Sequence, residues 1–233
     1  MARGYTRTAD YLSHAGIPVQ QVPITIYVNL KAPSATGTWD FFGEVKSSNA
    51  YFMLRASKLA DTSVTWRYMG KASFLSSFAA IWNTASLPPT WNTIAGVSES
   101  TTSHKLYAGG LLRNTQTTSC NPNVDSGTTY IGRSFSATLG YTGTIGVVAI
   151  WSAALNADEI AGLSGQLGTT PTRAAMVPWR VRPESLVACW PSVSRNASTE
   201  YNLAGTGYDM TVNGSPTIED GEGLGWTDHP IAA

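Results

Sequence analysis

Short segments in which apolar and polar residues alternate recur along the chain, separated by Gly, Pro, Asn, Ser and Thr. The clearest covers residues 23–30, where isoleucine, valine and leucine occupy every second position. Such alternation is typical of a strand with one buried face. Further strands are predicted at 38–46, 49–55, 63–69, 92–99, 128–132, 143–151, 186–190 and 208–212. The pattern predicts an all-β protein, built as an antiparallel sandwich or barrel.

Two local signals add a hairpin and a helix. Gly109 and Gly110 separate two short apolar runs, and both can adopt the positive φ that a tight hairpin needs. Asn156 can cap the first turn of a helix, and Glu159 follows three positions later, as in a capping box. A helix is therefore predicted from Asn156 to about Gly165. Residues 74–82 are interpreted either as a second helix or as a loop over one end of the sandwich.

The composition changes between residues 169 and 183, where three prolines and three arginines disfavour regular structure. This stretch could link two domains, but the 50 residues after it hold two predicted strands at most and could hardly bury a core alone. We therefore interpret residues 1–233 as a single sandwich domain. In this interpretation residues 168–184 form a long crossover, and residues 219–233 form an extended C-terminal arm.

Charge limits the classes of partner. The chain has 15 Lys and Arg against 15 Asp and Glu, and only 13% of its residues are charged, about half the ~25% usual for soluble domains. Zero net charge argues against a nucleic-acid partner. No stretch reaches the ~18 apolar residues of a membrane-spanning helix, and no apolar run of a secretory signal follows the N-terminus. We expect no membrane insertion and no signal peptide. The two cysteines are interpreted as free thiols.

Several segments together carry a family resemblance. They are 129–133, ending a strand in Ile-Gly, 141–151 with its Ile-Trp pair, 154–160 with Asp-Glu-Ile, 89–91, 105–110, 182–191 and 228–230. These segments resemble the concanavalin A-like lectin and glucanase superfamily in its laminin-G-like form, although the family usually has Asp where Gly109 stands. The resemblance implies a two-sheet antiparallel jelly-roll sandwich, with functions from glycan binding and protein adhesion to glucan hydrolysis. Many single-domain relatives resemble phage or prophage virion proteins.

The acidic residues do not suit glycoside hydrolysis. A retaining glucanase needs two carboxylates about 5 Å apart, and the Glu-x-Asp-x-x-Glu strand that such enzymes share on this fold is missing from the sequence. Asp158 and Glu159 suit the start of a helix. The three histidines, His14, His104 and His229, are far apart, and no Gly-x-Ser-x-Gly elbow occurs. We predict that the chain is not an enzyme, with a glucan hydrolase as a remote alternative.

Calcium is common in this superfamily and takes six to eight oxygen ligands, usually including several carboxylates. The candidate ligands are Asp40 with Glu44, or Glu219 with Asp220 and Glu222. No calcium-loop motif is present, and solvated surface charge is the competing interpretation. We therefore expect no required cofactor and leave calcium open.

The eight tryptophans are the best candidate recognition surface, because an indole can stack on a sugar ring or anchor a protein interface. Trp66, Trp91, Trp151 and Trp190 lie in predicted strands and are assigned to the core. The candidates for binding a glycan or a partner are Trp39, Trp82, Trp179 and Trp226, which lie beside turn-forming residues and are predicted to be partly exposed. Packing in the core or under loops is the competing interpretation for each.

These observations favour a non-catalytic virion structural protein, a phage capsid decoration or tail surface component. Its expected partners are other virion proteins, it is expected to be oligomeric or bound in an assembly, and it would lie on the virion surface after synthesis in the host cytoplasm. A weakly charged surface suits such contacts because few charges must be desolvated. The alternative is a lectin-like adhesin that binds a host surface glycan at a rim of the sandwich.

Overall fold

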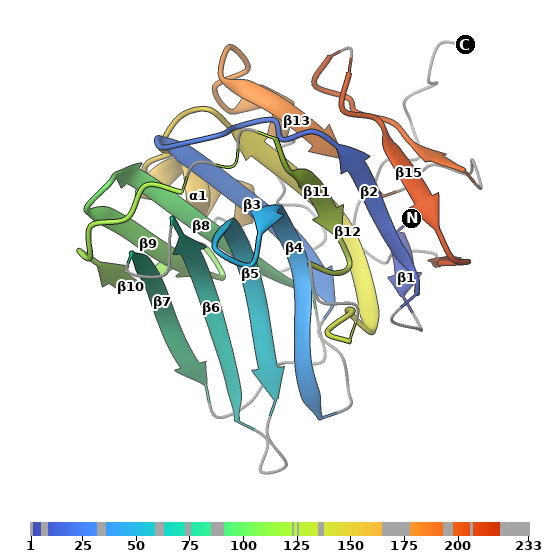
Figure 1. The fold of residues 1–233 in the computed structure, drawn as a ribbon, viewed down its shortest axis with the longest axis horizontal. Helices are drawn as coiled ribbons and strands as arrows, with labels where there is room; N and C mark the ends of the chain where they lie inside the picture. Colours follow the sequence, from blue (N-terminus) through green and yellow to red (C-terminus); the bar gives the residue numbers. More distant parts are fainter. Residues whose placement is uncertain are drawn as a thin grey trace.

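The computed structural model describes residues 2–5, 9–31, 36–58, 63–72, 76–84, 91–122, 124, 126–134, 138–164, 178–192, 198–205 and 207–219. Within these residues the chain forms two eight-stranded sheets that pack face to face (Figure 1). Neighbouring strands in both sheets are antiparallel. The all-β, two-sheet antiparallel sandwich predicted from the sequence is therefore confirmed.

Sheet A has the strand order β10-β9-β8-β3-β12-β1-β16, with β13 also paired to β12. Its strands are β1 (Ala2–Tyr5), β3 (Ile24–Lys31), β8 (Trp91–Ser100), β9 (Ser103–Ala108), β10 (Leu111–Gln116), β12 (Gly143–Trp151), β13 (Leu186–Trp190) and β16 (Thr217–Glu219). Ala2 pairs with Glu219. Strands from the two ends of the described chain therefore meet in this sheet.

Sheet B has the strand order β14-β15-β2-β11-β4-β5-β6-β7. Its strands are β2 (Tyr11–Ala15), β4 (Gly37–Ser47), β5 (Ala50–Lys58), β6 (Val64–Lys71), β7 (Ser77–Thr84), β11 (Thr128–Ile131), β14 (Thr199–Glu200) and β15 (Met210–Asn213). Ser13 of β2 pairs with Thr211 of β15. This sheet, too, joins an early strand to a late one.

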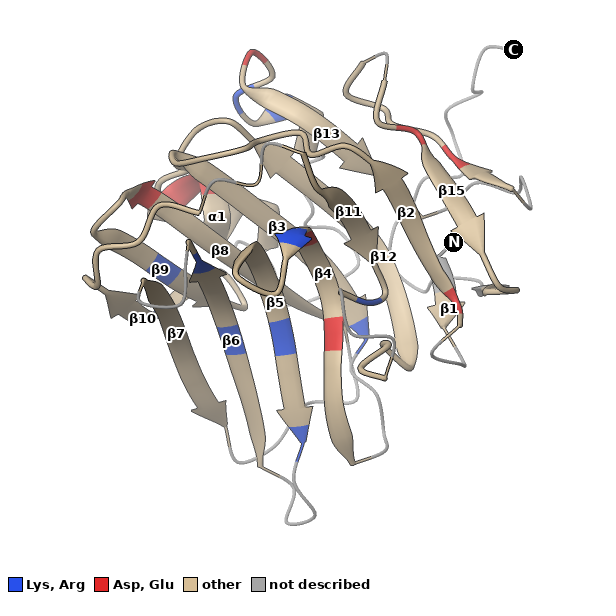
Figure 2. Cartoon of the chain, viewed as in Figure 1, with Lys and Arg blue, Asp and Glu red and all other residues tan. Residues whose placement is uncertain are grey.

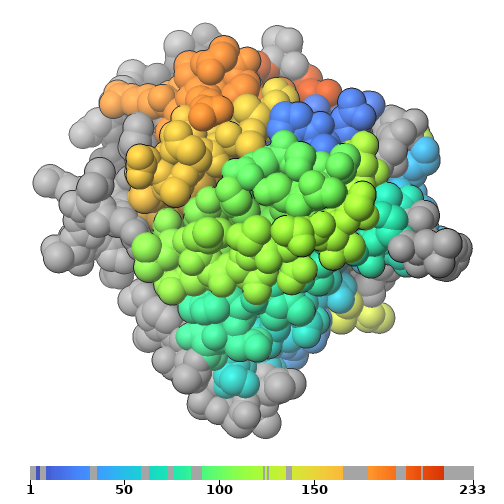
Figure 3. All heavy atoms as spheres, turned by 90° about the vertical axis from the view of Figure 1, so that its left-hand side faces the viewer, coloured from blue at the N-terminus to red at the C-terminus, as the bar shows by residue number. Residues whose placement is uncertain are grey.

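The main core lies between the two sheets. Alternate residues of each strand point into it, for example Phe52 and Leu54 of β5 and Trp66 and Tyr68 of β6, all of which are fully or almost fully buried. At one side, β7 of sheet B packs against β9 and β10 of sheet A (Figure 3). The sandwich is thus closed along this side by contact between its two sheets.

A second apolar cluster covers the outer face of sheet A. Helix α1 (Ala157–Ser164) and the 3-10 helix η2 (Pro178–Arg180) belong to this layer. Tyr27 donates a hydrogen bond to the Leu163 carbonyl at 2.8 Å, and the Trp151 indole donates to the Val181 carbonyl at 2.7 Å. Both described helices therefore lie on the side of sheet A, and the outward face of sheet B carries neither.

The predicted hairpin and helix are both confirmed. Gly109 and Gly110 have φ values of 58° and 77° and join β9 to β10. The Asn156 amide donates to the Glu159 carboxylate at 2.7 Å, and the Glu159 amide donates to the Asn156 side chain at 3.0 Å. These two bonds form the expected capping box, and α1 ends at Ser164, next to the predicted stop.

The interpretation of residues 74–82 is wrong, because Ser77–Thr84 form strand β7. Phe78 and Ala80 are buried while Ser77 and Ile81 are exposed, so the segment has the two-residue period of a strand. The late strand predicted at 208–212 begins only at Met210, since Tyr208 adopts a left-handed φ of 60°. Strands β1, β2, β14 and β16 were not predicted.

Cys120 and Cys189 are free and buried, as expected. Among the described residues no helix combines the length and apolar character needed to cross a membrane.

The predicted crossover lies mostly outside the described residues, which resume at Pro178. Of the predicted C-terminal arm only Glu219 is described, at the end of β16. The interpretation of the chain as one domain stays a prediction.

Candidate functional site

The outward face of sheet B is the candidate site. Side chains alternate along a strand, so the residues of β5 and β6 that flank the buried Phe52, Leu54, Trp66 and Tyr68 point away from the core. We define the outward face by Met53, Arg55, Arg67 and Lys71 of these two strands, of which Met53 is buried, together with Tyr11 of β2 and Tyr130 of β11. The face lies toward the viewer in Figure 1, where β4, β5 and β6 run side by side.

Asp40, Arg55 and Arg67 form a row across this face. Asp40 of β4 pairs with Arg55 of β5, which pairs with Arg67 of β6. Figure 2 shows the row as one red and two blue segments on neighbouring strands. One acidic and two basic side chains thus stand in line, perpendicular to the strands.

Asp40 holds Arg55 in place. The buried carboxylate accepts from Arg55 Nε at 2.5 Å and from Nη2 at 3.1 Å, and it also accepts from the Ser134 hydroxyl. Burial by itself lowers the pKa of Arg55, but the hydrogen bond and the charge of Asp40 outweigh this effect and leave the pKa raised. The charge of Arg55 is therefore compensated within the protein.

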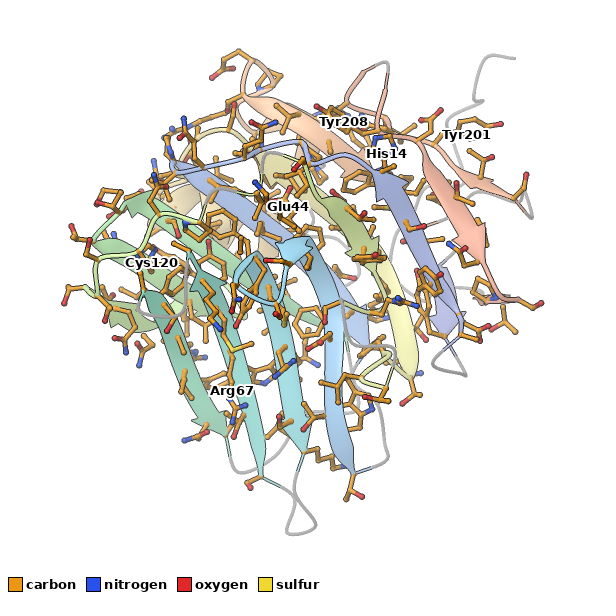
Figure 4. The ribbon with its side chains drawn as sticks, viewed as in Figure 1. His14, Glu44, Arg67, Cys120, Tyr201 and Tyr208 are labelled. Atoms are coloured by element: carbon orange, nitrogen blue, oxygen red, sulfur yellow. The ribbon has the colours of Figure 1, made fainter. Side chains whose placement is uncertain are left out.

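Arg67 differs from Arg55 in its surroundings. It is partly exposed, points out from β6, and has no hydrogen-bond or ion-pair partner among the described residues (Figure 4). Its neighbour on β7 is the exposed Ile81. The guanidinium group of Arg67 therefore keeps its donors available to a ligand.

An aromatic cluster lies on the same face, on β2 and β11. The Arg133 guanidinium lies 4.0 Å from the Tyr11 ring centroid and 5.1 Å from that of Tyr130. The two tyrosine rings are 6.2 Å apart and tilted by 57°. Cation–π contact of this kind holds the rings and the guanidinium together. The cluster offers flat, partly exposed surfaces of the kind on which sugar rings stack.

The structure places the predicted tryptophans elsewhere. Trp39 faces inward in one row with Ala56, Trp66 and Trp82, since each pairs with the next across β4 to β7. Trp39 is only 5% exposed, so its predicted partial exposure is wrong. Strand alternation, and not the nearby turn residues, determines its direction.

The other three candidate tryptophans have separate surroundings. Trp82 is partly exposed, packs against the core and lies under Arg113, whose guanidinium is 4.5 Å from its ring. Trp179 packs against the cluster on the outer face of sheet A, and Trp226 lies outside the described residues. None of the three described candidates belongs to the outward face. Trp91, assigned to the core, is partly exposed because it is the first residue of β8.

The candidate calcium pair is not brought together. A β-bulge between Asp40 and Phe42 shifts the register of β4, so Asp40 points outward and Glu44 points into the core. Asp40 is also fully engaged by Arg55 and Ser134. Asp40 and Glu44 therefore do not fit a calcium site. In the described ranges no three His, Cys, Asp or Glu side chains gather around a common point, and Asp220 and Glu222 lie outside them.

Glu44 is a buried carboxyl group. It is 0% exposed, and apart from the Val19 backbone its oxygens have no hydrogen-bond partner among the described residues. Burial raises the pKa of Glu44 well above its usual value, and the backbone of Val19 lowers it only in part. Glu44 is therefore held as a neutral acid inside the sandwich, where it cannot act on a surface ligand.

His104 is also an interior residue. Its Nδ1 lies 2.8 Å from the Ser98 hydroxyl, which lies 2.8 Å from the Tyr68 hydroxyl, and its ring stacks on Phe78 with centroids 3.7 Å apart. Nε2 faces the Thr101 carbonyl at 3.1 Å. Because a carbonyl only accepts, we assign the ring proton to Nε2. Burial lowers the pKa of His104, and backbone hydrogen bonds to Thr101 and Thr118 oppose this effect.

Two stacked antiparallel sheets with a helix packed on one of them define a jelly-roll sandwich of the lectin type. The chain belongs to the concanavalin A-like lectin/glucanases superfamily, whose family model matches residues 6–161. The resemblance noted from the sequence is therefore confirmed. No curated protein shows significant sequence similarity to the chain.

Solved structures of low sequence identity share the fold. A heptameric SAP-like pentraxin from Limulus polyphemus has a TM-score of 0.57 at 14% identity, covering 72% of this chain and 83% of the pentraxin. The CBM40 domain of an IT-sialidase from Ruminococcus gnavus has a TM-score of 0.54 at 14% identity, covering 70% and 96%. Tailspike protein 2 of Escherichia coli O157:H7 bacteriophage CAB120 has a TM-score of 0.57 at 12% identity, covering 80% of this chain and 26% of the tailspike.

Proposed function

We propose that the chain is a non-catalytic carbohydrate-binding module and that the outward face of sheet B is its binding surface. The observation that carries this proposal is the combination, on one sheet face, of the Tyr11–Arg133–Tyr130 cluster with Arg67, which has no hydrogen-bond or ion-pair partner within the described part of the chain. Aromatic rings supply the apolar contact for a sugar ring, and a guanidinium supplies directional donors for its oxygens.

The comparisons support this proposal at the level of fold. The Ruminococcus gnavus CBM40 domain has been solved with α2,3-sialyllactose bound. That domain and the present chain share the sandwich but only 14% of aligned residues, so the residues that would bind sugar here must come from this chain itself. The outward face supplies them.

The arrangement of acids supports a non-catalytic role. The acidic residues of β4 to β7 are Asp40 and Glu44, which lie on opposite faces of sheet B. Glycoside hydrolysis by paired carboxylates requires two carboxyl groups that flank the scissile bond in one binding site, about 5 to 10 Å apart. The outward face of β4 to β7 could therefore bind a glycan, but it lacks the pair of carboxyl groups that would cleave the glycosidic bond.

A glycan array followed by calorimetry with the best ligand tests the proposal. Tyr130→Ala should weaken binding at least about tenfold, because a stacked ring of this kind contributes about 1.5 kcal/mol. The matched control is Tyr201→Ala, which removes a tyrosine that is 50% exposed outside the defined face (Figure 4). Thermal unfolding of both variants checks that the fold is retained.

Two results would overturn the proposal. The first is that the wild-type chain binds no glycan on the array, with or without calcium. The second is that Tyr201→Ala abolishes binding while Tyr130→Ala has no effect, which would move the site to the rim of the sandwich. Loss of binding on calcium removal alone would add a metal to the site without moving it.

A virion surface location is the second candidate function, favoured by the shared fold with a phage tailspike domain. In this setting the module would attach a tail or capsid to a host glycan, so both proposals use the same face. The test is mass spectrometry of purified phage particles from the source organism, together with immunogold labelling. Finding the chain only in the soluble fraction would exclude the virion role and leave glycan binding untouched.

A further inference from the structure

Charge is distributed unevenly over the surface, although the whole chain has no net charge. Among the described residues of β4, β5 and β6, the outward side of sheet B carries the cations Arg55, Arg67 and Lys71 and the acid Asp40, and Arg133 lies over the neighbouring tyrosines. On the sheet A side, the acids Glu99 of β8 and Glu159 of α1 are paired with Lys105 and Arg182. The balance of the sequence therefore conceals a positive face, which Figure 2 shows over β5 and β6.

The pairing of Arg55 with Arg67 has no structural benefit of its own. Like charges directly opposite each other on neighbouring strands destabilise a sheet, and these two residues are direct partners. Asp40 compensates Arg55, but no described residue compensates Arg67. A carboxylate supplied by a ligand would compensate the charge of Arg67 at one end of the row, as Asp40 compensates that of Arg55 at the other end.

We propose that the face recognises an acidic oligosaccharide and that Arg67 binds the carboxylate of a uronic or sialic acid unit. This inference rests on the proposed function and specifies its ligand class. Arg67 can donate two parallel hydrogen bonds to a carboxylate, as Arg55 does to Asp40. The partly exposed position of Arg67 excludes some of the water that would otherwise weaken this contact.

The distance across the sheet sets the size of the ligand. Tyr130 on β11 and Arg67 on β6 are separated by three strand spacings, which is about 14 Å at the usual spacing of neighbouring strands. A single sugar does not span both groups, so the ligand is an oligosaccharide with its acidic unit over β6. Met53 and Met69 follow Tyr130 in one row across the sheet. Met53 is buried, so the partly exposed Met69 is the methionine that a ligand could contact, and methionines adapt readily to irregular partners.

Matched ligand pairs test this inference. The probes are 3′-sialyllactose against lactose, and oligogalacturonides against the same oligomers with methyl-esterified carboxyl groups, measured by calorimetry at low and high NaCl. We expect the wild type to bind at least one acidic member about tenfold or more tightly than its neutral partner, which corresponds to about 1.4 kcal/mol. High salt should reduce this preference, since ions screen the contact.

Variants assign the preference to Arg67. Arg67→Gln should reduce the preference for the acidic member to less than about twofold, because the charged donor for the carboxylate is lost, and Arg67→Lys should retain part of the preference because the charge remains without the bidentate geometry. Arg180→Gln, which removes an exposed arginine of η2 on the other side of the molecule, is the matched control and should keep the full preference. If Arg67→Gln does not fold, the preference for the acidic ligand is measured with Arg67→Lys instead.

The outcomes separate this inference from the proposed function. Equal binding of acidic and neutral members by the wild type, or an unchanged preference in Arg67→Gln, overturns the acidic ligand class and leaves carbohydrate binding standing. Binding of sulfated oligosaccharides in preference to carboxylated ones overturns the assignment of the anion. Absence of any sugar binding overturns the proposed function itself.

Discussion

Asp40 and Glu44 belong to the same strand, yet their side chains lie on opposite faces of sheet B. The bulge between Asp40 and Phe42 adds one residue to β4, so positions that a regular strand would place on one side are separated. Asp40 becomes the anchor of Arg55 on the outward face, and Glu44 becomes a buried neutral acid. A single inserted residue thereby determines the chemistry of both faces.

The ion pair between Asp40 and Arg55 should contribute strongly to stability. Asp40→Asn leaves the mostly buried Arg55 guanidinium without its counter-charge, and we expect the free energy of unfolding to fall by about 2 to 3 kcal/mol. Urea denaturation measures the change. Glu99→Gln, which removes the exposed partner of Lys105, is the control and should cost less than about 1 kcal/mol. Equal losses in the two variants would contradict the role given to Asp40.

Glu44 should make the free energy of unfolding fall as the pH rises above 4.5. Its pKa is raised in the folded state, so the stability that the neutral acid provides is complete below pH 4.5 and is lost as the pH rises toward its folded pKa. In Glu44→Gln this loss is absent. The difference in unfolding free energy should shift in favour of the variant by at most about 1.4 kcal/mol per pH unit above pH 4.5. Parallel stability profiles between pH 4 and 9 would show that Glu44 is ionised in the fold.

His104 should act in the opposite direction. Its pKa is lowered by burial, so the neutral ring contributes stability above pH 6.5 that is lost as the pH falls toward the folded pKa. Protonation would also remove the acceptor for the Ser98 hydroxyl at Nδ1. His104→Gln should be less stable at pH 7.5 but show a flatter profile between pH 6.5 and 5 in denaturant titrations. An unchanged slope in this window would contradict the neutral, buried histidine.

Trp39 should be important for folding and neutral for binding. Trp39→Ala removes a buried indole from the inward row with Trp66, and we expect a loss of about 3 to 5 kcal/mol. Trp39→Phe should retain more of the stability. Affinity for the glycan, measured on the folded fraction, should equal that of the wild type. A selective loss of affinity with normal stability would restore Trp39 to the binding surface.

The sequence predicted the regular part of the fold well. Residues 23–30 alternate, and residues 143–151 end in a continuous apolar run. Both segments are long enough to be found without a partner, and the Asn156–Glu159 capping box is a local pattern. β1 has only four residues, and its position depends on β12 and β16, which lie far along the chain. Such strands have no local signal strong enough to predict them.

The candidate site was harder to predict than the fold. Alternation in 49–55 and 63–69 already places Arg55 and Arg67 at polar positions, so the signal for an outward basic row was present. What the sequence does not show is that β4 lies next to β5 with a bulge at Asp40, or that Arg133 folds back over Tyr11. The predicted exposure of Trp39 is wrong because the row that contains Trp39 and Trp82 faces inward. Trp82 and Trp179 are partly exposed, as predicted, and their role in binding stays a prediction.

The pairing of β1 with β16 and of β2 with β15 has a consequence during biosynthesis. Strand β1 can be hydrogen-bonded on both sides only after Glu219, the partner of Ala2, has been synthesised. Strand β2 likewise requires Thr211, the partner of Ser13. On the ribosome, the earliest strands therefore remain open along one edge until the described chain is almost complete. Contacts of such large sequence separation make folding slow and leave strand edges able to pair with other nascent chains. Efficient production of this protein should therefore depend on chaperones that hold β1 and β2 apart from other chains until residue 219 has emerged.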